Sequence, residues 1–250
     1  MSLLEALAVL AAGLAAGTVN TIVGSGTLIT FPVLLAVGYP PVLANVSNTV
    51  GLTPGSVSGA IGYRAELAGQ RRRLLGLGVM SLVGGLTGGL LLLTLPQAAF
   101  QAIVPVLIAL SLVLVVLQPR LARRLAAPHE RAPHGGVPLH VGVFGSGVYG
   151  GYFGAAQGVL LIGLMGAFLD EDLQRINAAK NVLAGIVNAV AALLFVLVAD
   201  VAWQAAGLIA VGSVAGGQLG ALIGRRIPGP VLRTLIVAVG TVAIVQIVTG

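Results

Sequence analysis

The residues best suited to chemistry in this sequence are small polar side chains and glycines that interrupt an apolar stretch. Asn20, Thr21, Gly24, Ser25 and Gly26 lie between the apolar runs A-V-L-A-A-G-L-A-A and F-P-V-L-L-A-V. Amide and hydroxyl groups beside free backbone N–H groups can bind an anion through hydrogen bonds. Because polar groups are costly in an apolar environment, we favour a binding function here over the alternative that these small residues only permit tight helix packing.

A second interruption, G-G-Y-F-G-A-A-Q-G, occurs in the other half of the chain. Glycine permits an abrupt turn, so we expect a new helix to start at Thr27 in the first half and another after the break at 154–158 in the second. Each helix start carries about half a positive charge. The two starts are therefore predicted to converge into an anion-binding cradle that includes Gln157.

Neighbouring apolar spans add two groups of polar residues: Asn45, Ser47, Asn48 and Thr49 in the first half, and Asn177, Lys180, Asn181 and Asn188 in the second. The amides at 177, 181 and 188 repeat at helical spacing and so share one face. Lys180 is the only lysine, and it lies about 6 Å inside a helix expected to begin at Ile176. Two interpretations have equal weight: Lys180 snorkels to the interface, or it contacts an anion.

The composition identifies the environment of the chain. Of its 250 residues, 57% are hydrophobic and 8% are charged, and the mean hydropathy is +1.05. A water-facing surface needs about a quarter charged residues, so the chain is an integral membrane protein. Without period-2 alternation the spans are predicted to be helices. The first apolar run lacks a basic segment before it, so we expect it to be retained as structure.

The distribution of arginine predicts the orientation in the membrane. The twelve arginines are grouped around 64–73, 120–131, 175 and 225–233, whereas the connections at Pro96 and Asp200 contain none. The grouping favours a topology signal over nucleic-acid binding. We therefore expect the arginine-rich connections to face the cytoplasm and the other two to face outside.

Span lengths then predict an internal repeat. The expected single spans are 45–63, 74–95, 100–117, 176–198, 204–224 and 231–248, while 3–38 and 138–169 are too long for one helix and too short for two. Each of these two segments is predicted to be a broken re-entrant hairpin, although long tilted helices could absorb part of the length. The fold class is therefore an all-α polytopic membrane protein of two inverted repeats, 1–118 and 138–250, joined by a cytoplasmic linker at 119–137.

The residue types and motifs that the apolar spans lack limit the possible functions. All seven acids lie at span ends or loops, so no carboxylate is available at mid-membrane to bind a cation or relay protons. The three histidines, His129, His134 and His140, have no accompanying ligand set and the chain has no cysteine, so we predict no metal and no cofactor. No nucleophile or zinc-protease motif occurs, and an enzyme is not expected. The predicted passenger is an anion, which an interior-negative potential would drive outward.

At these motifs the sequence resembles the TauE/SafE family of membrane permeases, the sulfite exporters. The resemblance covers N-T-I-V-G-S-G-T-L-I-T-F-P-V-L-L, G-Y-P-P-V-L-A-N-V-S-N-T-V, G-A-I-G-Y-R, G-G-Y-F-G-A-A-Q-G-V-L-L and N-A-A-K-N-V-L-A. It implies an inner-membrane secondary transporter that exports sulfite or an organosulfonate, with the lipid bilayer as its surroundings and a passive anion channel as the alternative. The oligomeric state is unknown.

The resemblance also implies which residues bind the substrate. The family motifs correspond to Asn20, Thr21, Gly24, Gly26, Asn177, Lys180 and Asn181, to which the polar breaks add Ser25, Asn48 and Gln157. Two departures from the family pattern stand out. Ser25 and Thr27 interrupt the first glycine run, and G-A-A-Q-G stands where members often have G-A-G-x-G.

Overall fold

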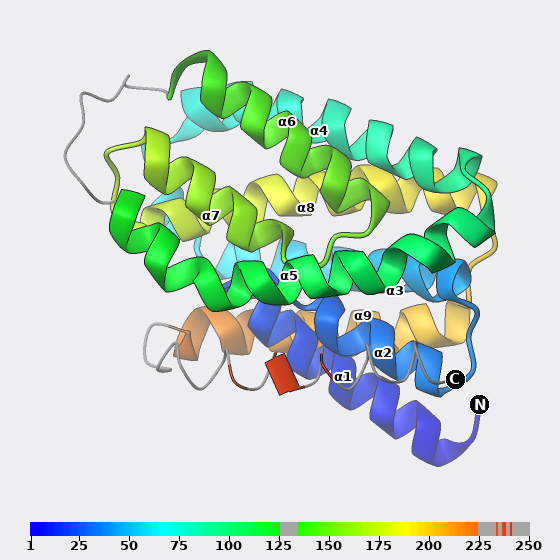
Figure 1. Cartoon of the computed structure of the whole chain (residues 1–250). Helices are drawn as coiled ribbons and strands as arrows, with labels where there is room; N and C mark the ends of the chain where they lie inside the picture. The colour runs from blue at the N-terminus through cyan, green and yellow to red at the C-terminus, as the bar shows by residue number, and fades with distance from the viewer. Residues whose placement is uncertain (126–134, 225–233, 235–236, 239–240, 242–250) are drawn as a thin grey trace.

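The computed structural model of the chain describes residues 1–125 and 135–224, together with the single positions 234, 237, 238 and 241 (Figure 1). All regular elements within these residues are helical, as the sequence predicted. The first half contains α1 (Leu3–Ile22), α2 (Thr27–Ala36), α3 (Pro41–Gly62), the short 3-10 helix η1 (Arg64–Leu67), α4 (Arg71–Thr94) and α5 (Gln97–Leu125). The second half contains α6 (Gly136–Tyr152), α7 (Gln157–Phe168), α8 (Leu173–Val198) and α9 (Trp203–Ile223).

Five of the described helices are long and apolar enough to cross a membrane: α1, α4, the 97–117 part of α5, α8 and α9. The chain is therefore a multi-pass membrane protein. The 22-residue α3 is long enough but carries many polar residues. Asn45, Ser47 and Asn48 of α3 are buried, so these polar groups face protein rather than lipid.

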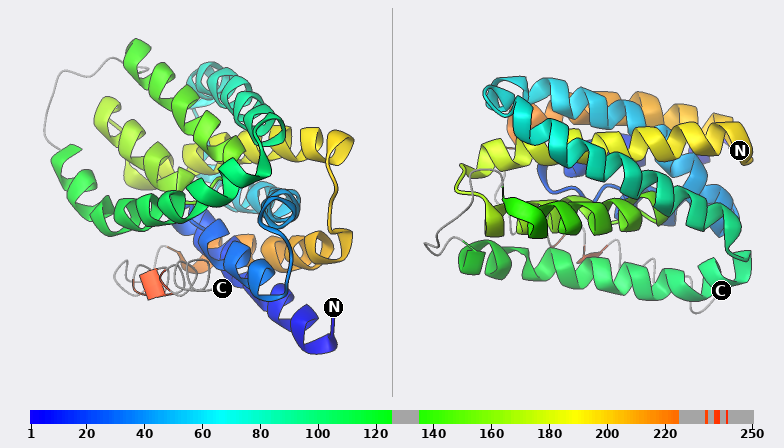
Figure 2. Two further views of the ribbon diagram at one scale, coloured as in Figure 1. Left: turned by 45° about the vertical axis from the view of Figure 1, so that its right-hand side comes forward. Right: turned by 90° about the horizontal axis from the view of Figure 1, so that it is seen from above.

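The long helices run beside one another in a bundle, seen from two further directions in Figure 2. α1 packs along α9 and α4 along α6, while α3 contacts both α8 and α9. Each polar interruption reverses the chain, so α2 returns beside α1 and α7 returns beside α6 (Figure 1). In the first reversal the backbone of Gly26 lies against the carbonyl of Ala16. α2 and α7 run from the middle of the bundle toward opposite ends.

Close helix contacts explain several of the glycines outside the two interruptions. A Cβ atom at any of five of them would overlap an atom of a neighbouring helix: Gly84, Gly88, Gly216, Gly217 and Gly220. At Gly85 and Gly89 the added Cβ would be tight, 3.0 and 3.1 Å from the nearest atom. For example, Gly88 lies against the carbonyl of Val148, and Gly216 against the carbonyl of Leu14. Only a hydrogen atom fits at the five closest contacts, so these glycines allow the helices to pack closely.

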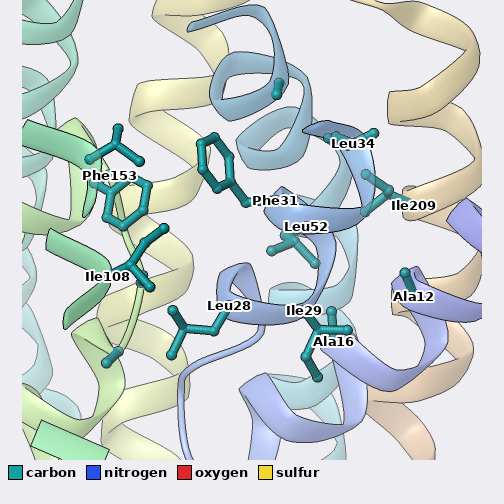
Figure 3. Packing of buried hydrophobic residues seen from close by; sticks show 14 of the residues in the cluster. Ala12, Ala16, Leu28, Ile29, Phe31, Leu34, Leu52, Ile108, Phe153 and Ile209 are labelled. Carbon is teal, nitrogen blue, oxygen red and sulfur yellow. The ribbon is translucent and has the colours of Figure 1, made fainter. Parts of the chain in front are cut away.

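An aromatic cluster joins the two interruptions and α5, and Figure 3 shows its members Phe31 and Phe153. Phe31 of α2 meets Phe153 edge-on, with ring centroids 5.4 Å apart, and Phe100 of α5 lies 6.2 Å from Phe153. Each such pair adds about 0.5–1.5 kcal/mol beyond its area burial. Leu28 and Ile108 belong to the same buried cluster. The cluster therefore packs α2 and the second interruption against α5.

Several helices are a few residues longer than the spans predicted from the sequence. α4 begins at Arg71. α8 begins at Leu173, because Asp172 caps it by accepting a hydrogen bond from the backbone N–H of Gln174 at 2.8 Å. α5 continues to Leu125, inside the segment assigned to the linker. His129, His134 and most of the span expected at 231–248 lie outside the described residues.

Candidate functional site

The two interruptions meet at Gly24 and Gly158. Gly24 has φ +87°, in the left-handed region that favours glycine. The backbone N–H of Gly158 donates to the carbonyl of Gly24 at 3.1 Å, and a Cβ atom on either residue would overlap the Cα of the other. Both the conformation and the close approach therefore require glycine at position 24.

Backbone donors without acceptors collect around this contact. In the described part of the chain, no hydrogen-bond acceptor is present for the N–H groups of Ser25, Gly26 and Thr27 at the start of α2, or of Ala155 and Ala156 before α7. All five residues are buried. Buried N–H groups without partners are rare in native proteins, so these five are the candidate donors to a bound ligand.

Two side chains beside these N–H groups also lack partners. The hydroxyl of Ser25, which is 0% exposed, and Nε2 of Gln157, which is 3% exposed, form no hydrogen bond in the described structure. The Gln157 amide lies over Gly150 of α6, in the space that a Cβ there would fill. Both groups can donate to an anion, and their role in binding stays a prediction.

Lys180 is the only charged side chain among the described residues that is buried, with 0% exposure. Its ammonium donates to the carbonyls of Asn20 at 2.8 Å and Thr21 at 3.0 Å, in the last turn of α1. It therefore does not snorkel to the interface. Seven residues into α8, it lies about 10 Å from the start of that helix. A cation at a helix C-terminus is favourable, because the carbonyls there carry partial negative charge.

Two amides of α8 reinforce this contact. Asn177 and Asn181 each donate through Nδ2 to the carbonyl of Thr21 at 3.2 Å. The sequence had placed Thr21 in the site through its side chain, whereas the structure uses its carbonyl as the acceptor of three donors. Oδ1 of Asn177 has no partner in the described structure.

Side-chain contacts with α3 stabilise the first interruption. Nδ2 of Asn48 donates to Oγ1 of Thr27 at 3.2 Å, and Oδ1 of Asn48 accepts from Oγ1 of Thr30. Asn48 thus fixes the first turn of α2. Nδ2 of Asn20 lies 3.5 Å from Oγ of Ser56, which also accepts from Nδ2 of Asn188 at 3.0 Å.

The second interruption has an anchor that sequence reasoning did not assign to the site. Nδ2 of Asn45 in α3 donates to the carbonyl of Tyr152, the last residue of α6, at 2.9 Å. The third helix of each half therefore holds the broken helix of the other half: α8 contacts the end of α1, and α3 contacts the end of α6. The only sequence signal for Asn45 was its position among the polar residues that open α3.

The acidic residues of the described chain lie in the first turn of α1, in η1 or in the connections after α7 and α8, and none of them is buried. Glu171, between α7 and α8, accepts from Arg73 at 2.9 Å and from Arg175 at 2.6 Å. Partial burial raises the pKa of Glu171, but the hydrogen bonds and charges of Arg73 and Arg175 outweigh it, so that the pKa falls below its ordinary value. No ion pair among the described residues includes Lys180.

Two hollows border the described helices. One hollow of about 430 Å³ lies between α3, η1 and α8, where Ser56 and Asn181 line it. Another of about 410 Å³ lies near Pro40, Gln97 and Asp200. Neither lining includes Ser25 or Gln157, and both of these side chains are buried.

Together, the apolar helices and the two interrupted helices that meet inside the bundle define a polytopic membrane protein of the transporter class. The sequence model of the family described as "Sulfite exporter TauE/SafE" matches residues 9–247. The chain belongs to the TauE/SafE family, and it is a membrane transporter.

Curated relatives carry the same general name. A "Probable membrane transporter protein YfcA" of Escherichia coli K12 is 27% identical over 229 residues, covering 91% of this chain and 83% of the relative. A "Probable membrane transporter protein" of Haemophilus influenzae is 27% identical over 209 residues, covering 84% and 81%. The ORF9 protein of Sinorhizobium sp, named likewise, is 27% identical over 232 residues, covering 90% and 85%. No solved structure gives a significant match.

Proposed function

We propose that this protein is a secondary transporter of small sulfur-containing oxyanions, such as sulfite or an organosulfonate, and that it exports them across the inner membrane. One observation carries the proposal: the five unpaired N–H groups at the two helix starts. The hydroxyl of Ser25 and the amide of Gln157 add two more donors there. An oxyanion has several strong acceptor atoms and would satisfy such a set.

Charge supports an anion over a neutral solute. The two helix starts contribute partial positive charge, and the aliphatic stem of Lys180 lies beside Gly158 at the same junction. The acids of the described chain are absent from the surroundings of that ammonium. The helix starts and the Lys180 ammonium therefore favour an anion over a cation at this point.

The helix pairing supports an inverted repeat of 1–118 and 138–250. If α1 to α4 correspond to α6 to α9, the α1–α9 pair corresponds to α6–α4, and the α3–α9 pair corresponds to α8–α4. The hydrogen bonds at the two interruptions follow the same correspondence. Lys180 of α8 bonds the end of α1, and Asn45 of α3 bonds the end of α6. Such repeats rock about a central site in alternating access. We place the linker at 119–137 in the cytoplasm on the arginine distribution.

Sulfite is the substrate we favour because the matched family is described as a sulfite exporter. The test is flux of sulfite from proteoliposomes containing purified protein, with and without an imposed potential, and with sulfate and methanesulfonate as competitors. We expect saturable flux that an interior-negative potential accelerates. Absence of flux for all three anions would reject the substrate class, and ohmic single-channel currents would identify a passive channel instead of a carrier.

A further inference from the structure

Two hydroxyl groups hold the carbonyl of Ala155 in the second interruption. The phenol of Tyr149, in α6, donates to this carbonyl at 2.6 Å, and Oγ of Ser111, in α5, lies 3.1 Å from it. The two hydroxyl oxygens are 2.6 Å apart. Ser111 is 0% exposed and also lies 2.7 Å from the carbonyl of Leu107. The three polar groups form one compact network between α5, α6 and the break.

The backbone after this carbonyl adopts an uncommon conformation. Ala156 has φ +58° and is the only non-glycine residue in the described chain with a positive φ. For an alanine this conformation costs about 1–2 kcal/mol, so the surrounding contacts must impose it. The same position is the one at which the family pattern G-A-G-x-G has its middle glycine.

The geometry of the peptide bond connects this network with the candidate anion site. In a trans peptide, the C=O of Ala155 and the N–H of Ala156 lie in one plane and point in opposite directions. Tyr149 and Ser111 hold the carbonyl on the side of α5 and α6, and the N–H of Ala156 therefore points away from them. That N–H is one of the five donors without an acceptor.

We propose that Tyr149 and Ser111 are positioning residues that aim the Ala156 N–H and the start of α7 at the transported anion. The role in anion affinity rests on the proposed function, whereas the effect on the backbone does not. Because the two hydroxyls share one acceptor, either can replace the other in part. Removing both leaves the buried Ala155 carbonyl without a partner.

The test compares Tyr149→Phe, Ser111→Ala and the double variant, with Thr87→Val as a matched control. Thr87 also bonds the carbonyl four residues earlier, in α4, and is half-buried. Each single change should raise the KM for sulfite by less than about 3-fold, and the double change by about 10-fold or more, as expected for an orphaned buried carbonyl. The maximal flux should fall less than the affinity. Tyr149→Phe combined with Ser111→Thr, which keeps one hydroxyl, should behave as a single variant.

Hydrogen exchange of the purified protein gives a readout that does not depend on transport. The double variant should exchange the amides of residues 154–160 faster than wild type, with α9 unchanged. Wild-type exchange in that segment overturns the inference even if sulfite is not a substrate. A double variant with wild-type KM overturns it where wild type transports sulfite, and absence of flux in wild type would reject the proposed function instead.

Discussion

The backbone N–H of Gly158 donates to the carbonyl of Gly24 at 3.1 Å, although the two residues lie in different halves of the chain. This bond places the start of α7 directly against the first interruption. If one interruption moves outward, it must therefore either break this hydrogen bond or move the other interruption with it. The contact also leaves the neighbouring N–H groups without protein acceptors.

The closeness of Gly24 and Gly158 predicts the effect of a single methyl group. Gly158→Ala should lower the free energy of unfolding by about 1–3 kcal/mol, because its Cβ would overlap the Gly24 backbone. Anion flux should be lost. Gly166→Ala in the same helix is the control, since no atom lies within 4 Å of the added Cβ. Thermal unfolding in detergent and flux in proteoliposomes measure both effects, and equal behaviour of the two variants would contradict the predicted contact.

Lys180→Gln separates the charge of this side chain from its hydrogen bonds. The amide can still donate to one of the two carbonyls, so the folded protein should persist with a loss of about 1–3 kcal/mol. Saturable anion flux should disappear because the positive charge at the junction is gone. Asn188→Ala, which removes a hydrogen bond to Ser56 instead, should keep flux. Wild-type KM in Lys180→Gln would show that the charge serves the fold alone.

The Arg73–Glu171–Arg175 cluster predicts a pH-dependent stability. Because the folded pKa of Glu171 is lowered, its stabilisation is present above the unfolded value and is lost as the pH falls through the folded pKa. Glu171→Gln should cost about 2 kcal/mol at neutral pH and progressively less below about pH 4. Unfolding curves across this range are the measurement, with the exposed Asp200→Asn as control. A difference between Glu171→Gln and wild type that does not change with pH would refute the assignment.

The predicted orientation can be tested with single cysteines, because the chain contains none. Pro40→Cys and Arg72→Cys lie beyond opposite ends of α3. In intact cells, a membrane-impermeant thiol reagent should label Pro40→Cys from outside and Arg72→Cys only after permeabilisation. Labelling of both from the same side would reject the topology inferred from arginine.

The sequence predicted the polar breaks well because their signals are local. Glycines beside small polar residues in an apolar run indicated the start of α2 at Thr27, and that start is observed. Glycine is common where membrane helices pack closely, which is the role of Gly88 and Gly216 in the structure.

The partners across the bundle could not be predicted in this way. Lys180 bonds carbonyls 160 and 159 residues earlier in the chain, and no local pattern encodes such a contact. Ser111 and Tyr149 resembled ordinary residues of apolar spans, because their role depends on the direction of the Ala155 carbonyl. Hydrogen bonds to the backbone leave little trace in side-chain patterns.

The central claim is that an anion binds where the two interruptions meet. Equilibrium binding of radiolabelled sulfite to the purified protein tests it most directly, with wild type, Gly158→Ala and Gly166→Ala measured side by side. We predict saturable binding to wild type and Gly166→Ala, and an affinity at least about tenfold weaker in Gly158→Ala, a difference of about 1.4 kcal/mol. Equal affinities in all three proteins, or no saturable binding to wild type, would contradict the claim.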